Sequence, residues 1–153
     1  ANIVPIFFNF EEEGLFGSSA FFRRYLSKKG SGIPGISIDP KSAYVINFDC
    51  VGRGKRIYVS GAKAVSKSLL ATPTAQLLGA SFTPYYASDH RSFRRPWQAA
   101  SFARADRYWM FSLEWIHSKA DVPEKVDFRY IEEVARIAEE GVRRMVAKEE
   151  QQR

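Results

Sequence analysis

Apolar residues along this chain fall into short runs separated by polar and glycine-rich turns. Runs of about four to eight residues that are rich in β-branched or aromatic side chains are typical of buried β-strands. They predict five strands, at Ile3–Phe10, Ala43–Val51, Arg56–Ser60, Trp97–Phe102 and Tyr108–Trp115. Amphipathic spacing predicts three helices, at Ser18–Lys29, Ala62–Ala71 and from Phe128 onward.

The first predicted strand, Ile3–Phe10, is nearly continuous in apolar residues, as expected for a strand that is covered on both faces. Pro5 has no N–H to give to a neighbouring strand. We therefore expect the paired part to begin at Ile6, or the strand to lie at a sheet edge. The helix that follows has Ser18 and Ser19 as candidate N-caps.

The last predicted helix has the strongest pattern. From Phe128 its apolar residues recur about every 3.6 positions, which predicts one buried face. They are Ile131, Val134, Ala135, Ala138, Val142, Met145 and Val146. Asp127 is placed to cap the first turn. Acidic residues four positions before basic ones predict ion pairs on the exposed face, at Glu132–Arg136, Glu139–Arg143 and Glu140–Arg144.

The order of these elements predicts an α/β sandwich with a mostly parallel or mixed sheet. At 153 residues the chain is long enough for one domain and short for two, so we expect a single domain over 1–153. A content of 45% hydrophobic and 26% charged residues excludes wholesale disorder. No apolar run approaches the roughly 18 residues of a membrane span. The single cysteine, Cys50, excludes an intramolecular disulfide and a cysteine-cluster metal site.

The charge pattern bears on the kind of partner. The formal net charge is +6, from 23 basic and 17 acidic residues. The basic pairs are spread along the chain, and neither zinc-finger spacing nor a recognition-helix pattern accompanies them. We therefore expect solvated surface charge rather than a nucleic-acid interface.

Four polar segments stand where α/β proteins often carry their chemistry, after predicted strands or in the loops between them. They are Glu11–Glu13, Asp49, Ser88–His90 and His117. Adjacent carboxylates repel, and a bound cation would compensate their charge; the alternative is an exposed acidic turn before a helix. A carboxylate near the end of an apolar strand must be paired, bound to metal or at the wet end of the sheet. A Ser-His-Asp triad within 88–90 is disfavoured because sequence neighbours rarely face one another.

The same segments form a recognisable series. Residues 11–18 read Glu-Glu-Glu-Gly-Leu-Phe-Gly-Ser, Asn47–Gly52 end a predicted strand, Ser88–Phe93 read Ser-Asp-His-Arg-Ser-Phe, and His117–Asp127 lead into the last helix. In this order they resemble four signatures of the di-zinc aminopeptidases, family twenty-eight of the metallopeptidases. These are Glu-Glu-x-Gly-Leu-x-Gly-Ser, Asn-(Leu/Phe)-Asp-Met-(Ile/Val)-Gly, Ser-Asp-His-x-x-Phe and His-Thr-x-x-Asp-Thr-x-Asp-x-(Ile/Val)-Asp. The resemblance implies a three-layer α/β sandwich with a mixed, mostly parallel sheet.

The resemblance also implies a role for each matching residue. Glu11 would take a proton from a metal-bound water and return it to the leaving amine. Glu12 and His117 would ligate one zinc ion and Asp49 the second, since carboxylates and imidazoles are ordinary zinc ligands. Zinc lowers the pKa of bound water to about 7 and so supplies a nucleophile at neutral pH.

Asp121, Asp89 and His90 are candidates for orienting these ligands or the substrate. The family's other ligands, a histidine in a His-x-Asp strand and an aspartate that bridges the metals, precede its Glu-Glu motif, and here only ten residues precede Glu11. Three explanations are open: a piece of a longer protein, a short relative that a second chain completes, or a relative that has lost catalysis. An uncovered strand edge would favour association, so we expect a homo-oligomer or a completing N-terminal segment or chain.

The predicted function is therefore a zinc-dependent aminopeptidase-like hydrolase that removes N-terminal residues from peptides. Two alternatives share the scaffold. One is a glutaminyl-cyclase-like acyltransferase with one zinc ion, and the other is a non-catalytic interaction module, which the incomplete ligand set would explain. The peptidase is favoured over the cyclase because the Glu-Glu segment and the His…Asp…Asp segment resemble the peptidases more closely.

Overall fold

The computed structural model describes residues 3–84, 87–93, 96–106 and 116–151. The described residues form a four-stranded sheet of β1 (Tyr44–Phe48), β2 (Arg56–Gly61), β3 (Ser81–Phe82) and β4 (Gln98–Ala105). The α-helices are α1 (Phe16–Phe21), α2 (Lys63–Leu70), α3 (Pro73–Leu77) and α4 (Phe128–Gln151). A π-helical turn, η1 (Phe22–Leu26), continues α1, and two 3₁₀ turns are η2 (Asp89–Ser92) and η3 (Pro123–Lys125). Within these ranges, none of the helices has both the length and the apolar content to cross a membrane.

The sheet is mixed, as the sequence predicts. Its strand order is β1-β4-β2-β3. β4 is parallel to β1, with Ile46 opposite Ala100, and antiparallel to β2, with Val59 opposite Phe102. β2 is parallel to β3. Two of the three pairings in the described part of the chain are parallel, which confirms a mixed, mostly parallel sheet.

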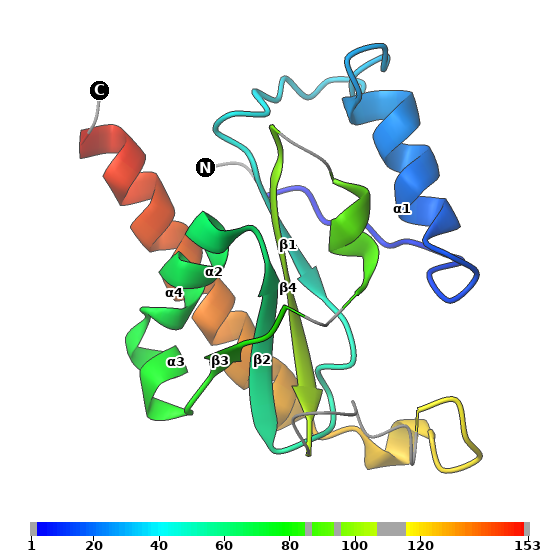
Figure 1. The fold of residues 1–153 in the computed structure, drawn as a ribbon, viewed down its shortest axis with the longest axis vertical. Coiled ribbons are helices and arrows are strands. Elements are labelled where there is room, and N and C mark those ends of the chain that lie inside the picture. Colours follow the sequence, from blue (N-terminus) through cyan, green and yellow to red (C-terminus); the bar gives the residue numbers. More distant parts are fainter. Residues whose placement is uncertain (1–2, 85–86, 94–95, 107–115, 152–153) are drawn as a thin grey trace.

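One face of the sheet packs against α2 and α4, which lie together on that side (Figure 1). The core there contains fully buried side chains from the sheet and both helices: Ile57, Val59, Leu69, Phe102 and Ile137. Gly141 lets α4 approach α2 closely, since a Cβ at this position would lie 2.5 Å from Leu69 Cδ2. Each large side chain buried in this way stabilises the fold by about 1.5–3 kcal/mol.

The opposite face of the sheet packs against α1 and η1 (Figure 1). Alternate strand residues point to opposite faces, so Val45 and Ala99 join a second apolar cluster with Phe93. Phe8 closes this cluster from the N-terminal segment, with its ring centroid 5.5 Å from that of Phe21. Because helices cover both faces, the three-layer arrangement is confirmed.

A buried arginine joins the sheet to the last helix. Arg104, at the end of β4, is only 2% exposed. Its Nη2 donates to Glu133 on α4, and its Nη1 donates to the carbonyl of Gly54 at 3.3 Å. The guanidinium also lies 4.1 Å from the ring centroid of Tyr130. Burial lowers the pKa of Arg104, and the charge of Glu133 opposes that shift.

Helix α4 begins where the sequence predicts. Asp127 Oδ1 accepts the N–H of Arg129 at 3.0 Å, so the predicted cap is confirmed. The predicted ion pair Glu139–Arg143 forms at 2.8 Å. Glu140 instead accepts two hydrogen bonds from Thr74, from its N–H at 3.1 Å and from its hydroxyl at 2.5 Å. The carboxylate of Glu140 thus binds the first turn of α3, whereas the sequence predicts a pair with Arg144.

The predicted strand at Ile3–Phe10 is wrong. The described part of this segment is irregular, with Ile3 86% and Phe7 94% exposed. A strand is held by hydrogen bonds to a neighbouring strand. Among the described residues β1 pairs with β4 alone, and Ile3–Phe10 pairs with no strand. The segment has the apolar pattern of a strand, but no described strand lies beside it to pair with it.

The caps predicted for the first helix are also wrong. Helix α1 begins after Leu15, whose φ is 62°, and neither Ser18 nor Ser19 caps it. Ser18 is buried, and its hydroxyl lies 2.7 Å from that of Ser92. The Ser19 hydroxyl lies 3.0 Å from the same oxygen. Both serines thus contact η2, which is distant in sequence, and the Ser18 hydroxyl also donates to the carbonyl of Leu15 at 3.3 Å. The helix ends with η1 at Leu26 and not at Lys29.

The remaining predicted elements are compared in the same way. The strands at 43–51, 56–60 and 97–102 are confirmed as β1, β2 and β4, and the helix at 62–71 is confirmed as α2. The sequence pattern did not predict the short elements α3, β3 and η2. Helix α3 has a local cap that could have indicated it, since Thr72 Oγ1 accepts the N–H of Ala75 at 3.2 Å. The strand predicted at Tyr108–Trp115 lies outside the described residues.

Replacing Glu133 by glutamine is expected to lower the free energy of unfolding by about 2 kcal/mol, because the buried Arg104 loses its ionic partner while the side-chain shape is kept. The matched control is Glu132→Gln, one residue away on the exposed side of α4, with an expected change below about 0.5 kcal/mol. Urea unfolding measures both variants. Equal stability of the two would contradict the role given to the Arg104–Glu133 contact.

Candidate active site

The acidic residues after the N-terminal segment lie on a tight turn that leads into α1. The N–H groups of Gly14 and Leu15 both donate to the carbonyl of Glu11, at 3.1 and 2.8 Å. This turn leaves Glu11 half-buried, whereas Glu12 and Glu13 are exposed. The first two carboxylates of the acidic run therefore have different surroundings, although they are adjacent in sequence.

Glu12 and His117 are brought together across more than one hundred positions of sequence. Glu12 Oε2 lies 3.2 Å from His117 Nε2, and the two side chains are 66% and 56% exposed. His117 reaches this position from the loop that precedes η3 and α4. A carboxylate oxygen and an imidazole nitrogen thus meet at the protein surface.

Asp49 stands just beyond the carboxyl end of β1. Its Oδ2 accepts the hydroxyl of Ser88 at 2.6 Å. Asn47 donates through Nδ2 to the hydroxyls of Ser88 at 2.9 Å and of Ser101 at 3.0 Å. These hydrogen bonds tie Asp49 to β1, to β4 and to the loop before η2. Asn47 and Ser88 lie inside the motifs recognised in the sequence, but that reasoning gave them no role.

Asp89 and His90 are both buried in η2. Burial raises the pKa of Asp89, while a hydrogen bond from Ser18 lowers it. Burial lowers the pKa of His90 to about 4, which leaves the imidazole neutral at physiological pH. Its Nε2 lies 3.5 Å from the hydroxyl of Ser60. Asp89 therefore lies beside Ser18 of α1, whereas the imidazole of His90 lies beside Ser60 of β2.

Asp121 is exposed on the turn that follows His117. Its N–H donates to the carbonyl of Ser118 at 3.0 Å. Among the hydrogen bonds and ion pairs of the described residues, none joins the Asp121 side chain to another candidate residue. Asp121 is thus close to His117 in sequence, but none of the described hydrogen bonds and ion pairs links its carboxylate to Glu11, Glu12, Asp49 or His117.

Glu11 shows that the candidate carboxylates share one electrostatic environment. Its pKa is raised from 4.5 to about 7, mainly by burial and then by the negative charges of Asp49, Glu12 and Asp89. The charge of His117 acts in the opposite direction. Asp49, Glu12 and His117 are therefore all near enough to Glu11 to influence its proton. An excess of negative charge of this kind is relieved by a bound cation.

Backbone strain is concentrated around the same residues. In the described part of the chain, the non-glycine residues with positive φ are Phe10 at 57°, Leu15 at 62°, Cys50 at 52° and His117 at 60°. Phe10 and Cys50 adjoin Glu11 and Asp49, Leu15 closes the acidic turn, and His117 is itself a candidate. Such conformations are unfavourable for residues with a Cβ and cluster at functional sites. Positive φ is uncommon for phenylalanine, leucine, cysteine and histidine, so the sequence contained no sign of these conformations.

The donor types fit a zinc ion, but their number does not complete a zinc site. Glu12 and His117 supply an oxygen and a nitrogen, which are ordinary zinc donors. Within the described ranges, however, no group of three or more histidine, cysteine, aspartate or glutamate side chains is arranged to hold a metal ion. A catalytic zinc ion usually has three protein ligands. The described residues thus offer part of a site.

Comparison with known proteins agrees with the fold and with the motifs. Peptidase family M28 matches residues 1–142. No curated protein sequence matches the chain. Among solved structures the chain is similar to BSAP, a zinc aminopeptidase from Bacillus subtilis, with 25% identity and a TM-score of 0.59. The match covers 94% of this chain and 34% of that protein, so the chain spans about a third of its length. The chain belongs to peptidase family M28, a family of hydrolases.

Proposed function

We propose that this chain carries the proton-transfer residue and part of the metal site of a zinc aminopeptidase that releases N-terminal residues from peptides. The observation that carries the proposal is the convergence of Glu12 and His117 at 3.2 Å next to a Glu11 whose pKa is about 7. Family membership supports it, since the family is typically zinc-dependent.

Glu11 is the residue suited to proton transfer. A carboxyl group with a pKa near the working pH exists in both protonation states, so it can accept a proton from water and give one to the leaving amine. It is half-buried, while Glu12 next to it is exposed. In the proposal Glu11 is therefore the general base and then the general acid.

Glu12 and His117 are suited to holding a metal ion. In the proposal they ligate one zinc ion, and Asp49, oriented by Ser88, faces a second. A bound zinc ion supplies a water of lowered pKa as the nucleophile. The described residues do not complete either ligand set, so in the proposal the remaining donors lie outside the described residues.

One observation favours a second function. The shortage of metal ligands in the described part of the chain is what a non-catalytic interaction module on the peptidase scaffold would have. This alternative predicts the same fold, no tight zinc binding and no hydrolysis. Zinc binding and peptide hydrolysis therefore separate the two functions.

Zinc binding is expected to depend on the Glu12–His117 pair. Titration calorimetry should show that Glu12→Gln and His117→Asn each weaken zinc binding at least about tenfold, because each removes a direct donor. Glu13→Gln is the control for the loss of one carboxylate from the same exposed turn. Unchanged affinity in the first two variants would contradict the metal role, and no binding by the unmodified chain would favour the interaction module.

Peptide hydrolysis is expected to depend on Glu11. With zinc present, Glu11→Gln should lower the release of free amino acid from a short peptide by about 100-fold or more, as expected for loss of a general base. Zinc affinity should change far less than in the Glu12 variant. Hydrolysis that survives in Glu11→Gln would contradict the proton-transfer role.

The stability of the metal-free protein should report the environment of Glu11. Since its pKa is higher in the folded state, the protonated group contributes stability fully below pH 4.5, and that contribution is lost as the pH rises through about 7. Glu11→Gln, which cannot ionise, should therefore become more stable than the unmodified chain as pH rises, by on the order of 1 kcal/mol because the site is partly solvated.

Urea unfolding near pH 4 and near pH 8 measures this difference, with Glu13→Gln as the control for removal of a nearby charge. A stability difference between Glu11→Gln and the unmodified chain that is the same at both pH values would mean that Glu11 titrates normally.

A further inference from the structure

A pocket of about 390 Å³ lies at the end of the sheet where β2 ends and β4 begins. We call it the η2 pocket, because His90 and Arg91 of η2 line it together with Ser60 and Gly61 of β2. Its volume is within the range of small-molecule sites. Because β4 is parallel to β1, the start of β4 lies away from Asp49, which follows the carboxyl end of β1. The η2 pocket is therefore separate from the candidate metal donors.

His90 has a buried polar atom without a hydrogen-bond partner. The residue is only 5% exposed, and its Nε2 lies 3.5 Å from the hydroxyl of Ser60, which also lines the pocket. Its Nδ1 is buried and makes no hydrogen bond within the described part of the chain. Buried polar atoms in proteins are almost always paired, because leaving one unpaired is unfavourable. An unpaired imidazole nitrogen in the lining of a pocket therefore points to a bound ligand.

Arg91 gives the pocket a positive charge. Its side chain is exposed, and the ion pairs formed among the described residues do not include it. Burial lowers the pKa of His90 and the charge of Arg91 lowers it further, against a smaller opposite effect of Asp49. The guanidinium thus lies near the imidazole. Because none of the described lining residues is acidic, an anionic group of a ligand can pair with Arg91.

The N-terminus of α2 adds to this positive potential. Ala62, the N-cap of α2, lines the pocket beside Gly61. No side chain caps the helix, and its first turn contains no acidic residue. The first N–H groups of a helix carry a partial positive charge and favour a nearby anion. Helix α2 and Arg91 therefore both favour a negatively charged group in the η2 pocket.

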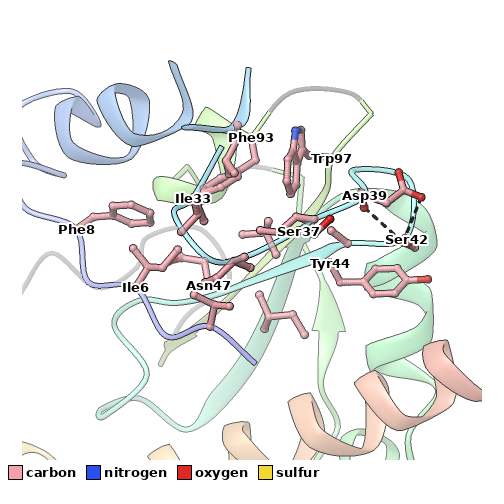
Figure 2. Close-up of a pocket in the computed structure, with 17 residues that line it drawn as sticks. Ile6, Phe8, Ile33, Ser37, Asp39, Ser42, Tyr44, Asn47, Phe93 and Trp97 are labelled. Atoms are coloured by element: carbon pink, nitrogen blue, oxygen red, sulfur yellow. Dashed lines mark hydrogen bonds between the residues drawn. The ribbon is translucent and has the colours of Figure 1, made fainter. Parts of the chain in front are cut away.

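The rest of the lining is apolar. Phe93 and Trp97 lie beside each other (Figure 2) and are nearly fully buried. Phe82 of β3 and Pro84 complete this part of the lining. Aromatic side chains of this kind bind apolar and aromatic groups. A small inorganic anion would leave them without contact, so the lining matches a ligand that has both an anionic and an apolar part.

We propose that the η2 pocket binds a small molecule in which a carboxylate is attached to an aromatic or branched apolar group. The carboxylate pairs with Arg91, whose planar guanidinium fits carboxylate geometry and matches a single negative charge. Ser60 donates its hydroxyl proton to Nε2 of His90 in this arrangement, so Nδ1 carries the imidazole proton and donates it to the ligand. The apolar group lies against Phe82 and Trp97. The site does not depend on the proposed function, since it uses none of the metal donors.

Titration of the metal-free full chain with phenylacetate, followed by NMR, tests the proposal. The amide resonances of Ser60–Ala62, the indole N–H of Trp97 and the nitrogen resonance of His90 Nδ1 should shift together and saturate. Phenylacetamide has the same shape without the charge, and acetate has the charge without the ring. Each should bind at least about tenfold more weakly than phenylacetate, because each lacks one of the two recognised parts.

A matched pair of arginine variants locates the charge. Arg91→Gln should weaken phenylacetate binding at least about tenfold, and because the side chain is exposed the fold should be kept. Arg136→Gln removes an exposed arginine of α4 that does not line the pocket, so it should leave the affinity unchanged. Equal affinity of the two variants would overturn the role of Arg91 and with it the proposed site.

Three further results would overturn the proposal. The first is the absence of saturable shifts up to about 10 mM phenylacetate. The second is binding of phenylacetamide or acetate as tightly as phenylacetate. The third is a set of shifts centred on 11–15 and His117, which would assign the probe to the candidate active site. Failure of zinc binding or hydrolysis would instead overturn the proposed function and leave the phenylacetate result intact.

Discussion

The parallel pairing of β4 with β1 is the constraint on which the rest of the structure depends. β4 also pairs with β2, so both halves of the described sheet share it. Its alternating side chains place Phe102 in the core that α2 and α4 cover and Ala99 in the cluster that α1 covers. The same pairing positions Asp49, whose N–H donates to the carbonyl of Phe102. Core packing and site geometry thus follow from one strand pair.

The candidate site combines features that are unfavourable for folding. Burial and then the charges of nearby carboxylates raise the pKa of Glu11 to about 7, and residues around the site have left-handed backbone conformations. Packing of the two apolar clusters elsewhere in the chain offsets these costs. Strained backbone and clustered carboxylates of this kind are typical of functional sites. Their presence here agrees with membership of a hydrolase family.

The open edge of the sheet and the incomplete set of metal donors are connected through one residue. The sheet ends at β1 in the described part of the chain, and the described residues supply fewer donors than a catalytic zinc ion usually has. Asn47 connects them, because it lines the pocket between β1 and the N-terminal segment (Figure 2) and also belongs to the hydrogen-bond network of Asp49.

The sequence by itself determined the elements that depend on local pattern. The period of α4, its Asp127 cap and the apolar runs of β1, β2 and β4 were predicted because side-chain spacing alone specifies them. Motif resemblance also indicated the family and the candidate residues. Only the tertiary structure decided that Ile3–Phe10 forms no strand, that Ser18 binds Ser92, and that Glu12 meets His117. Each of these depends on a partner distant in sequence, which no local pattern contains.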